Sequence, residues 1–201
     1  MTSKPPDLTI KLRLADSKDT ESIRELAIYT FSITFGYSLT IEDLNSYLAN
    51  AYSAHTISAE ISDPAMTTIV AENSNHPAEI IGFAQLLRGS SNKEPCLRNV
   101  ECPVEMHRLY VHPKYHGKSV GTKLIKKLEQ TAKDEGFSVI WLSVWEDHPV
   151  ARDIYERWGY VRVGEHPFRM GDCVQFRDTY AWSHYTCLRI LNLHRLTGIN
   201  D

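Results

Sequence analysis

The amino-acid sequence predicts an α/β fold in a single domain, and three observations lead to this prediction. The chain has 201 residues, of which 42% are hydrophobic, and this suits one sizeable core. Short β-rich runs alternate with segments whose apolar residues recur at helical spacing. Between residues 105 and 122, a strand-like run leads through a glycine loop straight into a helix. We find no internal repeat and no second domain in the sequence.

The N-terminal half predicts a strand, two helices and a hairpin. The strand covers residues 10–14, and Asp16 or Ser17 can cap the helix that follows it. A second helix starts at Thr40, with Asp43 three residues later in a variant of the capping box. The hairpin pairs residues 67–72 with residues 79–87 around a polar turn. In the first helix the residues at helical spacing are Ile23, Leu26, Ala27 and Phe31.

The C-terminal half continues the alternation of strands and helices. A polar, irregular segment over residues 89–103 leads to a strand that ends at Val111. The longest helix of the chain is expected to run from the glycine loop to Gly136. The remaining elements are a buried strand over 139–144, a helix over 150–157 and two closing strands over 160–163 and 179–183.

The glycine loop before this helix has the features of an anion site. Backbone N–H groups of residues 117–122 should converge at a helix N-terminus, where unpaired donors and the helix dipole favour phosphate oxygens. Gly117 and Gly121 allow a phosphate to approach the backbone closely, and Lys118 and Lys123 are placed to meet its charge. The alternative is an ordinary strand-loop-helix connection whose glycines only turn the chain.

The loop resembles the pyrophosphate loop of the GNAT superfamily of acyl-CoA-dependent N-acetyltransferases, which reads Gln/Arg-x-x-Gly-x-Gly/Ala. The pattern falls on residues 116–121, where His116 replaces Gln/Arg and Ser119 replaces the middle glycine. Because such a loop works mainly through backbone amides, a serine should fit it if its φ is negative.

A second stretch, residues 141–160, is similar to the family's strand followed by Asn-x-x-Ala-x-x-x-Tyr-x-x-x-Gly-Phe. The residues that match this motif are Ala151, Tyr155 and Gly159, while His148 stands at the asparagine and Tyr160 at the phenylalanine.

The resemblance narrows to the PaiA-like polyamine acetyltransferases. Residues 34–48 look like that subgroup's first helical hairpin, residues 105–111 like its fourth strand, and residues 164–175 like its Gly-x-His-x-Phe-x-Leu-Gly-Asp-Asp-x-Gln segment, with Cys173 in place of the second aspartate. The resemblance implies a GNAT fold, with a mixed central sheet of about seven strands flanked by about four helices. It also implies a single GNAT domain over residues 8–185 and a tail, 186–201, that docks on this domain or forms a dimer contact.

By the same resemblance, the chain binds acetyl-CoA as its cosubstrate. A backbone N–H of the strand Leu109, Tyr110 and Val111 should polarise the thioester carbonyl. The loop residues expected to bind the cofactor are His116, Gly117, Lys118, Ser119, Val120, Gly121 and Thr122. His148 could donate a hydrogen bond to the cofactor, or it could stand at the start of a helix that Asp147 already caps.

Acetylation of a primary amine needs a proton acceptor. An amine with a pKa near ~10.4 is protonated at pH 7, and freeing its lone pair costs about 4.6 kcal/mol. Glu105 lies on the strand that should lead the acceptor to the thioester, and the family's base is often a glutamate on this strand, acting directly or through water. The alternative for Glu105 is an ion pair with a neighbour such as Arg108. Glu146, at the end of the next strand, is the rival base.

The departing thiolate needs a proton donor, and the resemblance assigns this role to Tyr155. The family's tyrosine reaches the sulfur of CoA, and a phenol suits protonation of that leaving group. The alternative is that Tyr155, together with Ile154 and Trp158, packs into the core through the apolar face of a short helix.

Aromatic side chains are expected around the acceptor, because they suit an alkylammonium chain through cation–π contacts. By resemblance, Phe35 and Tyr37 form one wall, and His166 and Phe168 line the site as well. Glu146 is also expected to contact the acceptor. The alternative for His166 and Phe168 is a strand-end turn built around Pro167.

Composition argues against several other classes of protein. A net charge of −3 does not suit a dedicated nucleic-acid binder, and no apolar run approaches membrane-spanning length. The nine histidines show no zinc-like spacing with Cys, Asp or Glu, so we expect no metal. The four cysteines lack Cys-x-x-Cys spacing and indicate free thiols, which suit the cytoplasm, or the nucleus.

The expected function is therefore acetyl-CoA-dependent transfer of an acetyl group to a primary amine, with a small polyamine-like acceptor. The alternatives are a protein N-terminus, a lysine or an amino acid as acceptor, or a non-catalytic acyl-CoA-binding module with the same fold. The protein is expected to act as a monomer or a homodimer.

Overall fold

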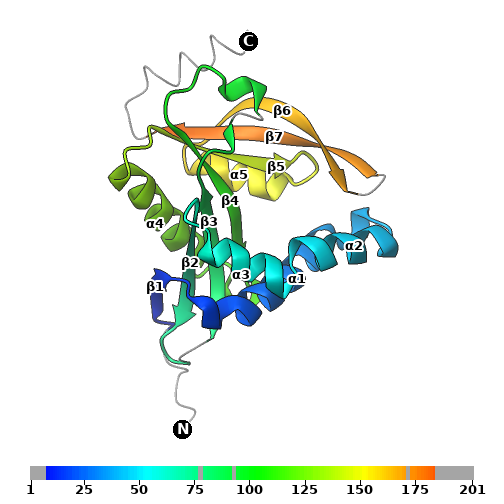
Figure 1. The fold of residues 1–201 in the computed structure, drawn as a ribbon, viewed down its shortest axis with the longest axis vertical. Coiled ribbons are helices and arrows are strands. Elements are labelled where there is room, and N and C mark those ends of the chain that lie inside the picture. The colour runs from blue at the N-terminus through cyan, green and yellow to red at the C-terminus, as the bar shows by residue number, and fades with distance from the viewer. Residues whose placement is uncertain (1–7, 77–78, 92–93, 171–172, 184–201) are drawn as a thin grey trace. The chain divides into compact units, whose positions relative to one another are not determined.

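A computed structural model describes residues 8–76, 79–91, 94–170 and 173–183, with the backbone alone at 168–170 and 173–175. The helices and strands are drawn in Figure 1. They follow one another as β1 (Ile10–Leu14), α1 (Thr20–Phe35), α2 (Ile41–Ala51), α3 (Ala54–Ser62), β2 (Met66–Asn73), β3 (Ile80–Leu87), β4 (Pro103–Val111), α4 (Val120–Asp134), β5 (Val139–Trp145), α5 (Pro149–Arg157), β6 (Val161–Met170) and β7 (Cys173–Ser183).

The strands of the described chain form one seven-stranded sheet with the order β1-β2-β3-β4-β5-β7-β6. β4 pairs with β5 in parallel, whereas the pairs β1–β2, β5–β7 and β6–β7 are antiparallel. The sheet is therefore mixed, and the predicted fold class and number of strands are confirmed.

Five α-helices lie in the part of the chain that the structure describes, where about four were expected. The difference comes from α2 and α3, which only Tyr52 and Ser53 separate. α2 begins where the capping pattern predicts, because the Thr40 hydroxyl accepts a hydrogen bond from the Asp43 N–H at 3.1 Å. The helix after the glycine loop is not the longest, since α4 has 15 residues and α1 has 16.

The chain divides into two compact units that share three elements. Unit 1 consists of the residues up to Gln85 together with Arg108–Leu128, and unit 2 consists of Leu86–His107 together with the residues from Glu129 onward. β3, β4 and α4 each contribute residues to both units. A single domain over residues 8–185 stays a prediction, and the tail 186–201 lies outside the described residues.

Unit 1 buries the apolar face that helical spacing predicted for α1. α1 packs on α3, and α3 packs on β2. Fully or almost fully buried side chains come from every layer of this unit: Ile23, Leu26 and Phe31 of α1, Ile57 of α3, Ile69 of β2, Phe83 of β3 and Leu124 of α4. Burial of each such side chain contributes roughly 1.5–3 kcal/mol to the stability of the fold. This packing holds in place the end of β4, from which the glycine loop starts.

Unit 2 is built on β5, β6 and β7. Its core cluster consists of Leu97, Val139, Trp141, Val163 and Ala181. β6 and β7 form a hairpin whose register runs from Val161↔Ala181 to Met170↔Cys173, so both strands are longer than predicted (Figure 1).

The alternative of a strand-end turn around Pro167 is wrong, because Pro167 pairs with Phe176 inside this hairpin. Gly164 and Pro167 have low β-propensity, and for this reason the sequence pattern ends the strand early. The structure accommodates both residues, since the register shifts between Arg162 and Gly164 and since β6 is the last strand in the order. A proline is tolerated on an edge strand, where its missing N–H costs no ladder bond.

Candidate functional site

The loop between β4 and α4 belongs to unit 1 and is built from two left-handed residues. Gly117 has φ +72 and Ser119 has φ +63. The first helical bond of α4 runs from the Lys123 N–H to the Ser119 carbonyl at 3.0 Å, so α4 starts directly after Ser119. The N–H groups of Val120, Gly121 and Thr122 have no acceptor within α4, because the residues four positions earlier lie outside the helix. An anion site requires such unpaired donors.

The condition under which a serine should fit the loop, a negative φ, is not met at Ser119. The chain must reverse between His116 and Val120, and it does so with residues 117 and 119 both in the left-handed region. A side chain in this region costs roughly 1–2 kcal/mol, which explains why the family pattern favours glycine there. Gly121 does not turn the chain, because it is the second residue of α4.

The side chains of the loop contact the chain itself. His116 Nε2 lies 2.9 Å from the carbonyl oxygen of Val111 and so ties the loop back to the end of β4. The Lys118 ammonium lies 5.1 Å from the centre of the Tyr115 ring, within cation–π range. His116, Gly117, Lys118 and Ser119 are all exposed, so this loop is open to a ligand from solvent.

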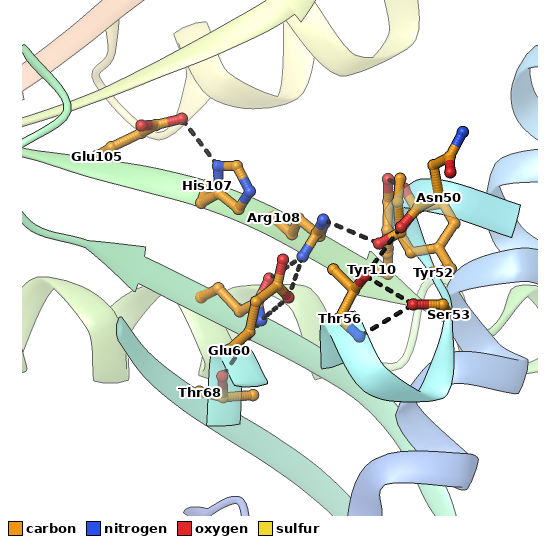
Figure 2. A network of polar contacts seen from close by, with 12 residues as sticks. Asn50, Tyr52, Ser53, Thr56, Glu60, Thr68, Glu105, His107, Arg108 and Tyr110 are labelled. Carbon is orange, nitrogen blue, oxygen red and sulfur yellow. Dashed lines mark hydrogen bonds and ion pairs between the residues drawn. The ribbon is translucent and has the colours of Figure 1, made fainter. Parts of the chain in front are cut away.

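Arg108 of β4 anchors a buried polar network in unit 1 that sequence reasoning missed (Figure 2). Its guanidinium donates to Glu60 of α3 at 2.5 Å and to Gln85 of β3 at 2.8 Å. It also lies 5.1 Å from the centre of the Tyr52 ring. Burial lowers the pKa of Arg108, but the facing Glu60 outweighs it, so the pKa is raised and Arg108 stays charged.

Tyr110, next on the same face of β4, extends this network. Its hydroxyl lies 2.7 Å from the hydroxyl of Tyr52, whose side chain is fully buried. Desolvation by burial, and then the neighbouring Tyr110, raise the pKa of Tyr52 well above its ordinary value. The predicted role of residues 109–111 concerns their backbone N–H groups, and it stays a prediction.

Glu105 of β4 lies in unit 2, and its partner is not the one the sequence suggested. Its Oε1 lies 3.0 Å from Nδ1 of His107, whereas Arg108 pairs with Glu60. Strand geometry explains the correction, since residues 105 and 107 share one face and residue 108 points to the other (Figure 2). The alternation of side chains along a strand was the signal that could have found this pair.

Two opposing effects set the protonation state of Glu105. Burial raises the pKa of its carboxyl. The hydrogen bond with His107 and the positive charges of His107 and Arg177 lower the pKa, and their combined effect is larger than that of burial. The net result is a pKa below the ordinary value, so Glu105 is a carboxylate at neutral pH.

α5, which also lies in unit 2, begins with His148 as its cap and not with Asp147. His148 is the N-cap, and its Nδ1 accepts a hydrogen bond from the Ala151 N–H at 3.1 Å. Asp147 therefore does not cap this helix, because the imidazole already satisfies a first-turn donor. Gly159, which follows α5, has φ +86, and this left-handed conformation accounts for the glycine in the motif.

Tyr155 lies on α5, where no residue is fully buried. Its ring makes edge contacts with Trp158 at 5.8 Å and with Tyr160 at 5.7 Å between ring centres. Tyr155 itself is half-buried. Its role as the proton donor stays a prediction.

The residues expected around the acceptor fall into both units. In unit 1, Phe35 lies 4.7 Å from Phe31 between ring centres, and Tyr37 is 76% exposed. In unit 2, Glu146 is exposed, and His166 Nδ1 lies 3.2 Å from Glu94 Oε2. Phe168 pairs with Gln175 in the β6–β7 ladder, and its side chain lies outside the described residues.

Among the residues that the structure describes, no group of three or more His, Cys, Asp or Glu side chains could hold a metal ion. No helix in this part of the chain combines the length and the hydropathy needed to cross a membrane.

The geometry of the β4–α4 loop and of α5 agrees with a comparison against known families. The model described as "Acetyltransferase (GNAT) family" matches residues 34–160, which include Glu105, the loop and Tyr155. The chain belongs to the acetyltransferase (GNAT) family. It is therefore an acetyl-CoA-dependent N-acetyltransferase, and we do not retain the alternative of a non-catalytic module.

Relatives of this GNAT enzyme cover most of its length. It is 25% identical over 163 residues to an uncharacterised N-acetyltransferase of Lactobacillus delbrueckii subsp. lactis, across 81% of this chain and 91% of that protein. It is 27% identical over 153 residues to an uncharacterised N-acetyltransferase of Mycobacterium bovis, across 76% of this chain and 90% of that protein. Among solved structures, its fold is similar to that of the PaiA N-acetyltransferase of Thermoplasma acidophilum in complex with coenzyme A. The TM-score is 0.67, at 21% identity, across 87% of this chain and 100% of that chain.

Proposed function

We propose that this GNAT enzyme acetylates the primary amine of a small polyamine-like acceptor. The observation that carries the proposal is the likeness to PaiA, both in the three sequence segments 34–48, 105–111 and 164–175 and in the fold of nearly the whole chain. Three carboxylates of unit 2 provide negative charge for a cationic acceptor. They are the buried Glu94, the half-buried Glu105 and the exposed Glu146.

The β4–α4 loop is the proposed site for the pyrophosphate of acetyl-CoA. Its first-turn N–H groups at Val120, Gly121 and Thr122 provide donors, and the helix dipole adds positive potential. When bound, acetyl-CoA supplies an activated acetyl thioester. His148 is proposed to hydrogen-bond the cofactor through its Nε2, because its Nδ1 is the acceptor of the helix cap.

Two residues are proposed to move protons. Glu105 draws the proton away from the acceptor amine, and Tyr155 gives its phenolic proton to the departing sulfur. Phe35, Tyr37, His166 and Phe168 are proposed to contact the acceptor, and the free thiols of Cys96 and Cys102 support a reducing compartment such as the cytoplasm. A monomer or a homodimer remains our expectation for the assembly.

The acceptor is tested with purified protein, acetyl-CoA and detection of the released thiol. Spermidine, spermine, an aminoglycoside, free lysine and an N-terminal peptide are compared by their kcat/KM. We expect the two polyamines to give the highest values. A peptide that exceeds every small amine would reject the polyamine acceptor and leave the acetyltransferase activity standing.

Tyr155→Phe serves as the mechanistic variant in the same assay. Because only a hydroxyl is lost, turnover should fall by roughly 10²-fold while the affinity for acetyl-CoA stays nearly unchanged. Near-normal turnover of the folded variant would mean that Tyr155 only packs against Trp158 and Tyr160.

A further inference from the structure

Glu105 and His107 form a hydrogen-bonded pair on one face of β4. The Oε1–Nδ1 distance is 3.0 Å, and the side chains are 15% and 30% exposed, respectively. The strong cation next in the chain, Arg108, points to the other face and is bound to Glu60 (Figure 2). Arg108 is therefore not the partner of Glu105, whose Oε1 lies against the imidazole of His107.

The carboxylate alone is poorly suited to take a proton from an ammonium group. Its pKa lies below the ordinary value, for the reasons given above, while a primary amine has a pKa near ~10.4. Efficient proton transfer needs a base whose protonation changes near the working pH, and histidine is the side chain that meets this condition.

The hydrogen bond also selects the form of the imidazole. A carboxylate can only accept, so at 3.0 Å the neutral His107 carries its proton on Nδ1. The lone pair then lies on Nε2, on the far side of the ring from Glu105. A carboxylate that orients a histidine in this way also stabilises the imidazolium that forms when Nε2 takes a proton.

We propose that His107 is the base of the acetyl transfer, with its Nε2 receiving the proton of the acceptor amine and Glu105 orienting the imidazole. This inference rests on the proposed function and replaces direct proton transfer to Glu105 by transfer to its partner. A further positively charged group that acts on Glu105 is Arg177 of β7, a strand that β5 separates from β4 in the sheet.

The protons balance as follows. The ammonium group of the acceptor loses two protons, of which the first goes to His107 Nε2 and then to water. The C–N bond forms and the C–S bond breaks, while Tyr155 gives its proton to the sulfur. The second proton of the nitrogen restores Tyr155 through water, so the products are the amide, the thiol of CoA and one proton in solution.

The kinetic test uses spermidine and acetyl-CoA from about pH 6 to about 9. His107→Gln should lower kcat/KM by about 10²-fold and remove the rise of the rate with pH that deprotonation of the base produces, with acetyl-CoA affinity unchanged. His55→Gln, at an exposed position of α3, is the matched control and should leave both unchanged. Persistence of the same rise in folded His107→Gln would overturn the proposal.

Two variants of Glu105 separate an orienting role from a direct one. Glu105→Gln keeps an oxygen that can accept from Nδ1–H, so it should lose about tenfold in kcat, whereas Glu105→Ala should lose about as much as His107→Gln. If Glu105 itself takes the proton, both variants would lose equally, and the proposal would be wrong.

A measurement without any acceptor distinguishes failure of this inference from failure of the proposed function. The nitrogen chemical shifts of His107, observed by NMR in the protein alone, report which ring nitrogen is protonated. We expect the Nδ1–H form in the wild type and a shift toward the Nε2–H form in Glu105→Ala. The Nε2–H form in the wild type would refute the pair even if spermidine is acetylated, while the Nδ1–H form supports it even if spermidine is not a substrate.

Discussion

Ser119 holds a backbone conformation that its own side chain disfavours, at the residue where the glycine loop becomes a helix. Its φ of +63 is shared by few residues other than glycine, asparagine and aspartate. The strain is local, and the packing of α4, whose Leu124 and Leu128 are buried, offsets its cost. The loop therefore keeps its shape through the helix rather than through the preference of its own residues.

Ser119→Gly should relieve this strain. The left-handed conformation costs a serine roughly 1–2 kcal/mol, and glycine avoids this cost. Glycine loses about 0.5–1 kcal/mol more in backbone entropy on folding, so the free energy of unfolding should rise by about 0.5–1 kcal/mol. Urea denaturation measures the change. Ser119→Ala is the control, since it keeps the strained φ and removes the hydroxyl, and it should give no gain. Equal stabilisation by alanine would assign the effect to the hydroxyl instead.

The sequence motif located this position but could not give its φ. A motif tells which residue types occur, and a serine is compatible with either sign of φ until the length of the reversal is known. The same limit applied to Glu105, for which the sequence offered Arg108 as partner. Side chains of a strand alternate between faces, so His107 was the nearer group in space.

At the scale of the elements, Arg108 links β4 to α3 through Glu60. The two side chains are 10% and 16% exposed, so neither charge is well solvated once its partner is removed. The cost of breaking such a pair comes from the charge that stays behind, rather than from the energy of the pair itself.

Glu60→Ala should therefore lower the free energy of unfolding by about 3 kcal/mol, and the double variant Glu60→Ala/Arg108→Met should lose less than the single variant. Chemical denaturation measures both. Glu21→Ala, which breaks an exposed pair with Arg24 on α1, is the control and should change stability by under about 0.5 kcal/mol. A double variant that is less stable than Glu60→Ala would contradict a stranded charge as the cause.

Elements with strong local signals were predicted closely, and those set by distant pairing were not. β1, the Thr40 cap of α2 and the strand-loop-helix unit follow from periodicity and capping within a few residues. α3 was not predicted, since its nine residues carry a single buried side chain, Ile57. The lengths of β6 and β7 depend on their pairing with each other, which overrides the low β-propensity of Gly164 and Pro167.

At the scale of the whole molecule, acetyl-CoA should stabilise the fold by mass action. At a hundredfold excess over the dissociation constant, the expected gain is about 2.7 kcal/mol. Gly121→Asp places a carboxylate in the first turn of α4, where it should repel the pyrophosphate and abolish the gain. Thermal unfolding with and without acetyl-CoA measures it. Lys126→Glu, on the exposed face of α4, is the control for added negative charge and should keep most of the stabilisation. A folded Gly121→Asp variant with the full gain would remove the anion-site argument.

The sharing of β3, β4 and α4 between the two units has a consequence for biosynthesis. The chain passes from one unit to the other after Gln85, after His107 and after Leu128, so neither unit is a continuous segment. Unit 1 possesses all of its residues once Leu128 has been added to the nascent chain, whereas α5, β6 and β7 of unit 2 are still to be translated. At about 5–20 residues per second, the remaining residues take several seconds. The loop proposed to bind acetyl-CoA is thus synthesised in full before Tyr155 exists, and a nascent chain released in this interval would carry the anion loop without its proton donor.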